Sequence, residues 1–82
     1  MTYDLKNAHR HSYENQLEIE ASRLCVCFYC CRQFPSSSVL NWCDNENTAL
    51  CPNCGIDAVI GDASGLPVTE QAVIQKINKR WF

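Results

Sequence analysis

Seven cysteines are the residues of this 82-residue chain with the clearest capacity for chemistry. Four of them form two short motifs, CFYC at 27–30 and CPNC at 51–54, which twenty residues separate. The pattern C-x2-C-x20-C-x2-C is typical of structural zinc sites with four thiolate ligands. In the second motif, proline fixes one backbone dihedral angle, and Gly55 can adopt the positive φ that closes a tight turn. We therefore predict one Zn²⁺ per chain, bound by Cys27, Cys30, Cys51 and Cys54.

A zinc ion with four thiolate ligands has no coordination position left for water. Such a site is expected to stabilise a fold rather than to activate a nucleophile. His9 and His11 are two positions apart in a predicted helix, so they should lie on different faces and act as solvated or packing residues. We therefore predict that the protein is not an enzyme.

Iron is the alternative metal, because rubredoxin holds one iron in the same double-turn pattern. Rubredoxin is more acidic and lacks the long N-terminal helix predicted here, so zinc is favoured over iron. A disulfide framework is disfavoured by the odd number of cysteines and by the lack of an export signal. Cys25, Cys31 and Cys43 are expected to be small buried apolar residues; redox sensing or alternative metal ligation is the other interpretation.

The length predicts one domain, 1–82, whose hydrophobic core would be marginal without a metal. No stretch is apolar enough for a membrane span, and the polar N-terminus does not resemble a secretory signal. A cytoplasmic location without membrane association is therefore expected.

The chain divides into a helical N-terminus (1–23), a metal-binding core (24–61) and a C-terminal helix (68–82). In the first part, an apolar stripe at helical spacing comprises Tyr13, Leu17, Ala21 and Leu24. The alternation of apolar residues and glutamates at 17–21 also allows a short strand, but helix is favoured. Thr69 is the expected N-cap of the last helix.

In the core, residues 24–29 should form the strand that enters the first cysteine motif. A helix of about two turns is expected to begin near Ser36 or Ser37. Strands at 48–50 and 56–60 should pair as a hairpin around the second motif. The predicted fold class is thus α+β: a small zinc-ribbon-like β-hairpin domain flanked by N- and C-terminal helices.

Charge is distributed unevenly around a formal net charge of −2. The middle of the chain is acidic, and the last twelve residues are basic and end in two aromatic residues. Those aromatic residues are expected either to close the core or to contact a partner. The candidate partner-binding residues are Lys79, Arg80, Trp81 and Phe82, with the acidic loops around Asp44, Glu46 and Asp62 as the other candidate surface.

The favoured function is a non-enzymatic, zinc-stabilised module that binds an unidentified protein. Nucleic-acid binding is the alternative, because the C-terminal helix is locally basic, although the negative net charge disfavours it. A thiol or iron redox protein is less favoured. A homodimer is also considered, because two long helices cannot easily bury both apolar stripes behind one small hairpin.

Two motifs carry a resemblance to a known family: CFYC at 27–30 and CPNCGID at 51–57. With His11-Ser12 and the terminal Trp81-Phe82, they make the chain resemble a family of small bacterial proteins described as cytoplasmic proteins. The resemblance implies a zinc-ribbon-like fold in which the four cysteines of the two motifs hold the metal. It implies no particular activity.

Overall fold

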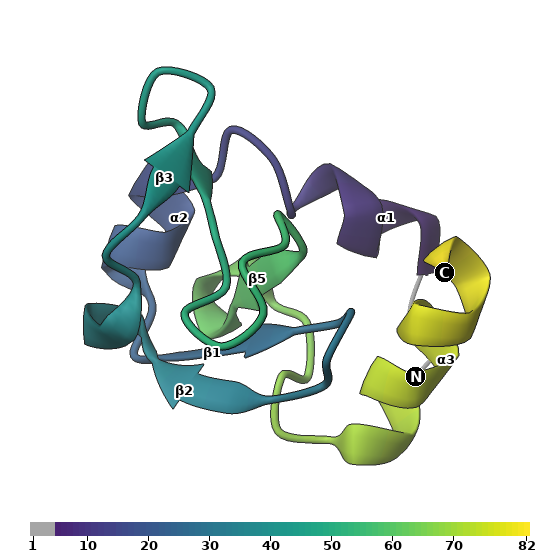
Figure 1. Cartoon of the computed structure of the whole chain (residues 1–82). Helices are drawn as coiled ribbons and strands as arrows, with labels where there is room; N and C mark the ends of the chain where they lie inside the picture. The colour runs from purple at the N-terminus through teal and green to yellow at the C-terminus, as the bar shows by residue number, and fades with distance from the viewer. Residues whose placement is uncertain (1–4) are drawn as a thin grey trace.

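Two helices precede five antiparallel strands and one helix follows them along residues 5–82, which the computed structural model describes (Figure 1). The predicted α+β class is therefore confirmed, with a hairpin sheet and a C-terminal helix. The elements in chain order are α1 (Leu5–Arg10), α2 (Gln16–Ala21), β1 (Leu24–Cys27), β2 (Gln33–Pro35), a 3-10 turn (Ser36–Ser38), β3 (Trp42–Cys43), β4 (Thr48–Ala49), β5 (Val59–Gly61), a second 3-10 turn (Asp62–Ser64) and α3 (Gln71–Trp81).

Strand β1 is the centre of a three-stranded antiparallel sheet with the order β2-β1-β5. Cys25 lies opposite Phe34 on one neighbour and opposite Gly61 on the other. Both faces of β1 are buried from Cys25 to Cys27, which explains its uninterrupted run of apolar residues. The expected strand that enters the first cysteine motif is therefore confirmed and is the central strand of the sheet.

The predicted hairpin between 48–50 and 56–60 is wrong. Strand β4 pairs instead with β3, with Trp42 opposite Ala49, and β5 pairs with β1. The first motif, at 27–30, lies in the hairpin between β1 and β2, whereas the second lies in a long loop between β4 and β5. Strands of two or three residues have little pairing preference of their own, so packing across the chain selects their partners.

The N-terminal region forms two short helices instead of one long helix. Residues 11–15 interrupt it, and Glu14 has a φ of 47°, outside the right-handed helical region. Residues 1–4 of the predicted helical segment 1–23 lie outside the described residues. The helix favoured at 17–21 is confirmed as α2.

The interruption is stabilised by the buried side chain of Asn15. Its amide group donates to the backbone oxygens of His11 (3.0 Å) and Val59 (2.8 Å) and accepts from the N–H of Ala49 (3.0 Å). One side chain thereby connects the turn before α2 to β4 and β5. These partners lie far away in sequence, so helical periodicity could not reveal the break.

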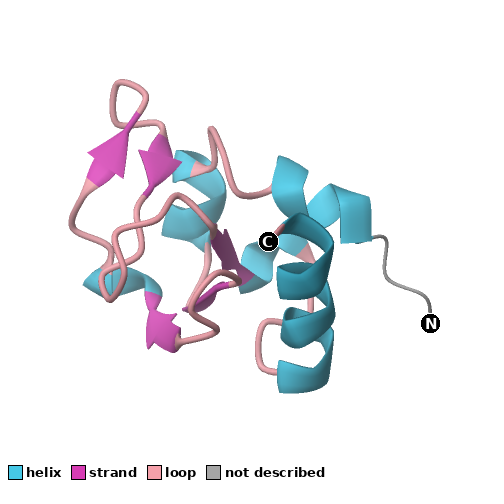
Figure 2. Cartoon of the chain, turned by 45° about the vertical axis from the view of Figure 1, so that its right-hand side comes forward, coloured by secondary structure: helices cyan, strands magenta, loops and turns pink. Residues whose placement is uncertain are grey.

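The predicted apolar stripe of this region is also wrong. Tyr13 and Ala21 are exposed, and 80% of the Leu17 surface is accessible, whereas Ile19 is buried. In the second half of the chain, the buried residues of α3 are Ile74 and Ile77, which form the inner face of this helix. Helix α1 lies beside the C-terminal part of α3, away from α2 (Figure 2).

Two further elements differ from the prediction. The helix expected after Pro35 is a single 3-10 turn, and Leu40 beyond it is 80% exposed. Helix α3 begins at Gln71, with Glu70 rather than Thr69 as its N-cap residue and without a side-chain capping bond. The last helix is therefore shorter than 68–82.

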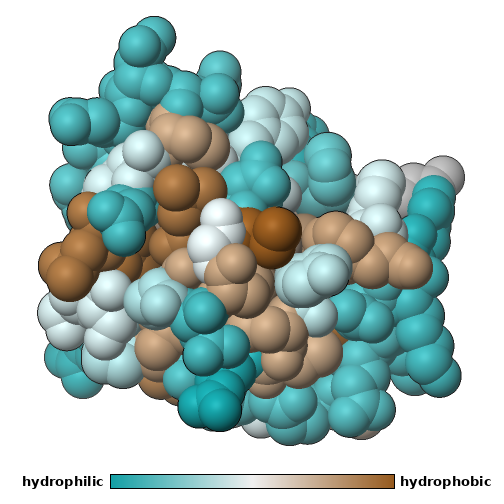
Figure 3. Space-filling view, viewed as in Figure 1, coloured by the Kyte–Doolittle hydropathy of each residue, from teal (hydrophilic) through white to brown (hydrophobic). Residues whose placement is uncertain are grey.

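Apolar surface is not confined to the interior. Figure 3 shows hydrophobic residues across the middle of the face seen in Figure 1, with hydrophilic residues above and below. Among residues 8–82, the large hydrophobic residues that remain exposed are Tyr13, Leu17, Tyr29, Leu40 and Phe82. Among the described residues, no helix is long and apolar enough to cross a membrane.

Candidate metal centre

The four predicted metal ligands converge on one point. The Sγ atoms of Cys27, Cys30, Cys51 and Cys54 all lie within 4.8 Å of one another. Cys27 Sγ lies 3.6 Å from Cys54 Sγ, and Cys30 Sγ lies 3.7 Å from Cys51 Sγ. Tetrahedral coordination with metal–sulfur bonds of about 2.3 Å requires sulfur atoms about 3.8 Å apart. The cluster thus has the composition and nearly the spacing of a four-thiolate metal site.

The two cysteine motifs have matching backbone geometry. The first cysteine of each donates its backbone N–H, at 3.0 Å in both cases, to the residue five positions later, which is Arg32 or Ile56. Its carbonyl accepts from the residue four positions later, at 2.7 Å from Cys31 and 2.9 Å from Gly55. Those two residues have φ angles of 63° and 79°. Cys31 therefore adopts the left-handed conformation that glycine supplies in the second motif.

Backbone N–H groups point toward the sulfur atoms of these turns. In the second motif, the N–H groups of Asn53 and Cys54 donate to Cys51 Sγ, with distances of 3.3 and 3.4 Å. Donors in this position stabilise a thiolate, which is the form of cysteine that binds metals. The local turn therefore positions the cysteine side chain and also favours the thiolate form that binds metals.

The electrostatic environment differs among the four ligands. Burial raises the pKa of Cys30, but hydrogen bonds from the Arg32 backbone, the Asn53 side chain and neighbouring cysteines outweigh it and lower that pKa to about 7. Burial is the main cause that raises the pKa values of Cys27 and Cys54. Of these three thiols, Cys30 is therefore the one whose pKa lies closest to neutral. A bound cation would favour loss of the other protons, since metal coordination requires thiolates.

The site joins two segments that are distant in sequence. Cys27 ends the central strand β1, and Cys51 follows β4 in the loop that passes in front of the sheet (Figure 1). Both of these residues are buried, whereas Cys30 and Cys54 are half-buried. A metal bound here would hold the β1–β2 hairpin against the β4–β5 loop.

The other three cysteines lie outside this cluster. Full burial is confirmed for Cys25, whereas Cys31 and Cys43 are only half-buried. Burial, together with the negative charge of Asp62, raises the pKa of Cys25 to about 11, so its thiol is protonated and unreactive at neutral pH. Burial likewise raises the pKa values of Cys31 and Cys43.

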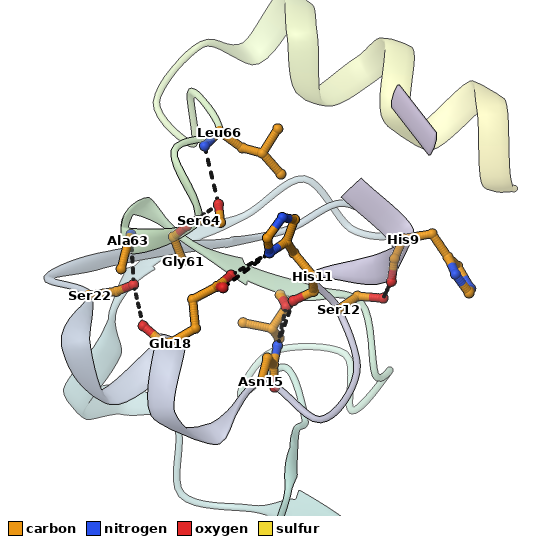
Figure 4. Close-up of polar contacts among 11 residues, drawn as sticks. His9, His11, Ser12, Asn15, Glu18, Ser22, Gly61, Ala63, Ser64 and Leu66 are labelled. Carbon is orange, nitrogen blue, oxygen red and sulfur yellow. Dashed lines mark hydrogen bonds and ion pairs between the residues drawn. The ribbon is translucent and has the colours of Figure 1, made fainter. Parts of the chain in front are cut away.

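Both histidines contact other side chains. His11 Nδ1 lies 2.8 Å from a carboxylate oxygen of Glu18, and the two side chains point toward each other in Figure 4. The His9 ring stacks on Trp81 with 4.4 Å between centroids, which confirms a packing role for His9. The contact between His9 and Trp81 connects α1 to α3. The contact between His11 and Glu18 connects the turn 11–15 to α2.

The candidate partner-binding residues lie together at the end of α3. Lys79 and Arg80 are exposed, and the Arg80 guanidinium lies 4.7 Å from the centre of the Trp81 ring. Trp81 is half-buried against α1, whereas Phe82 is 57% exposed and contacts the Tyr29 ring edge-on at 4.8 Å. Trp81 thus closes part of the core, while Phe82 stays accessible.

Fold and site together define a small α+β protein with a four-cysteine candidate metal centre. Comparison of the sequence with models of protein families, and of the chain with curated proteins and solved structures, found no match. The family resemblance of the two cysteine motifs therefore stays a prediction.

Proposed function

We propose that this protein is a non-enzymatic module in which one structural Zn²⁺ stabilises a surface that binds another protein. The convergence of four Sγ atoms within 4.8 Å carries this proposal. Soft thiolate ligands in a tetrahedral arrangement suit zinc. In this proposal the metal has a closed ligand set of four cysteines and holds two distant segments together. A cytoplasmic location, where thiols stay reduced, belongs to the same proposal.

The exposed aromatic surface near the metal centre supports a protein partner. Tyr29, inside the first cysteine motif, is 47% exposed, and its ring contacts that of Phe82. Aromatic and arginine side chains are enriched at protein interfaces, and Arg80 lies two positions before Phe82 in the sequence. The metal would therefore position the Tyr29 ring, because Tyr29 belongs to the turn of the first cysteine motif.

Elemental analysis of the untagged protein tests the metal. One zinc per chain is expected for the wild type and for Cys43→Ser, whose thiol is outside the cluster. Cys51→Ser should lose the metal. Iron at this site would overturn the zinc assignment and favour electron transfer instead.

The partner surface is tested with a purified partner recovered by affinity capture and identified by mass spectrometry. Reconstituted binding should weaken about tenfold or more in Phe82→Ala and Tyr29→Ala, as expected for aromatic interface residues. Leu40→Ala is the matched control, because Leu40 is also an exposed hydrophobic residue but lies in another segment. Equal weakening in all three variants would contradict this surface.

Nucleic-acid binding is the second candidate. Lys76, Lys79 and Arg80 are exposed on α3, which contains no acidic residue. Reversal of these three charges should abolish a salt-sensitive shift of DNA or RNA. No shift at low salt would eliminate this candidate.

A further inference from the structure

A cavity of about 260 Å³ lies among α1, the segment before β5 and the C-terminal end of α3. Most of its lining is aromatic, and one carboxylate reaches it. The residues that matter to its chemistry are His9, Tyr13, Phe28, Asp57, Trp81 and Phe82. Sequence patterns did not reveal this cavity, because its lining comes from four separate segments, including the first cysteine motif.

The rings form two groups. His9 stacks on Trp81 and lies 6.2 Å from Tyr13, which makes one aromatic group. Phe28 and Phe82, 5.7 Å apart, make the other. Phe28 is buried and belongs to the turn of the first cysteine motif, so the metal centre supports this group directly. Rings from separate elements therefore surround one cavity.

Among the described residues, Asp57 is the only carboxylate in the lining. Its side chain is exposed and makes no hydrogen bond or ion pair with the side chains that the structure describes. Among the described side chains, none with a permanent positive charge lines the cavity; the Arg80 guanidinium lies over the Trp81 ring, 4.7 Å from its centre. The cavity thus combines aromatic rings with a carboxylate that forms no ion pair with the described side chains.

We propose that this cavity binds the ammonium group of a lysine side chain on the partner protein. Aromatic rings attract a cation through their quadrupole, and Asp57 would accept a charge-assisted hydrogen bond from the ammonium group. The aliphatic stem of lysine packs well against aromatic rings. A phosphate would be repelled by Asp57, and a neutral apolar group would leave that carboxylate without a counter-charge. This inference rests on the proposed function, because it names the chemistry of the same partner.

The test is an NMR titration of the metal-loaded, full-length protein. The probe is Nα-acetyl-lysine N-methylamide, and its Nε-acetylated form is the uncharged control. The charged probe should shift the signals of Asp57 and of the Trp81 indole N–H, and the acetylated probe should bind at least about tenfold more weakly. Asp57→Asn should weaken binding by a similar factor, and Tyr13→Leu by about threefold to fivefold. Glu46→Gln removes an equivalent charge from another exposed loop and should change nothing.

Each remaining outcome overturns the inference. Equal binding of both probes would show an apolar pocket, and preference for choline or an arginine probe would indicate a different cation. Shifts caused by adenosine monophosphate, but not by the lysine probe, would indicate a base-stacking site. Asp57 is exposed and makes no bonds to the described residues, so its substitution should leave folding intact, which circular dichroism checks. A partner complex that Asp57→Asn does not weaken would refute the inference alone, whereas absence of zinc would refute the proposed function alone.

Discussion

Removal of the metal from the four-cysteine cluster is expected to unfold the protein. Twenty residues separate Cys30 from Cys51, and a metal bound by both closes this loop. By analogy with a disulfide that closes a loop of similar length, the constraint alone contributes about 3 kcal/mol. Structural zinc binds small peptides with an apparent free energy of about 10–16 kcal/mol at neutral pH, which includes this constraint together with direct metal–thiolate bonding.

These contributions exceed what the rest of the molecule supplies. At 0.05–0.15 kcal/mol per residue, a domain of this size has a total free energy of unfolding of about 4–12 kcal/mol. The sheet that forms its centre consists of strands with only three or four residues each. Loss of the metal therefore removes more free energy than such a fold retains.

The assay is a chelator titration followed at once by far-ultraviolet circular dichroism and by a colour reaction for released metal. Both signals should change in a single transition, and addition of zinc should restore the spectrum. Cys51→Ser should resemble the chelated protein. Cys43→Ser should resemble the wild type, because Cys43 lies outside the cluster.

Two results would refute this reasoning. A spectrum that stays unchanged after complete release of the metal would show that packing alone holds the fold. Equal metal loss in Cys43→Ser and Cys51→Ser would show that the position of a thiol inside or outside the cluster does not determine whether it binds the metal.

Four substitutions test the surrounding structure through urea unfolding of the protein at a fixed concentration of free zinc. Gly61→Ala should lower the free energy of unfolding by about 1–3 kcal/mol, because an added Cβ would lie too close to the Ser22 side chain, 2.8 Å from its Cβ; an unchanged midpoint would contradict this close contact. Asn15→Ala should lower it by about 2–4 kcal/mol, since buried backbone groups in two strands lose their hydrogen-bond partners; a loss below about 0.5 kcal/mol would contradict the bridging role. Cys31→Gly should raise the free energy of unfolding by up to about 1 kcal/mol, because φ is positive at this position. Gly55→Ala, at the matching position of the second motif, should lower the free energy of unfolding.

Local patterns along the chain were sufficient to identify the candidate ligands. The two-residue spacing within each cysteine pair, with Gly55 after the second, selects four of the seven cysteines, because such spacing allows both thiols of a pair to face one point. Strand β1 was also predictable, since a continuous apolar run indicates a strand that is buried on both faces. The buried face of α3 also follows from its amphipathic sequence, in which the buried residues Ile74 and Ile77 lie three positions apart.

Tertiary structure decided which segments pair and where the helices end. The sequence around Thr48–Ala49 has no feature that favours β3 over β5 as its partner, and strands this short obtain little stability from local preference. The break between α1 and α2 depends on Asn15, whose hydrogen bonds to β4 and β5 exist only in the folded chain. The aromatic cavity with Asp57 likewise requires α1 and α3 to meet. Spacing within a turn thus determined the ligands, whereas contacts between distant segments determined the surface that the metal supports.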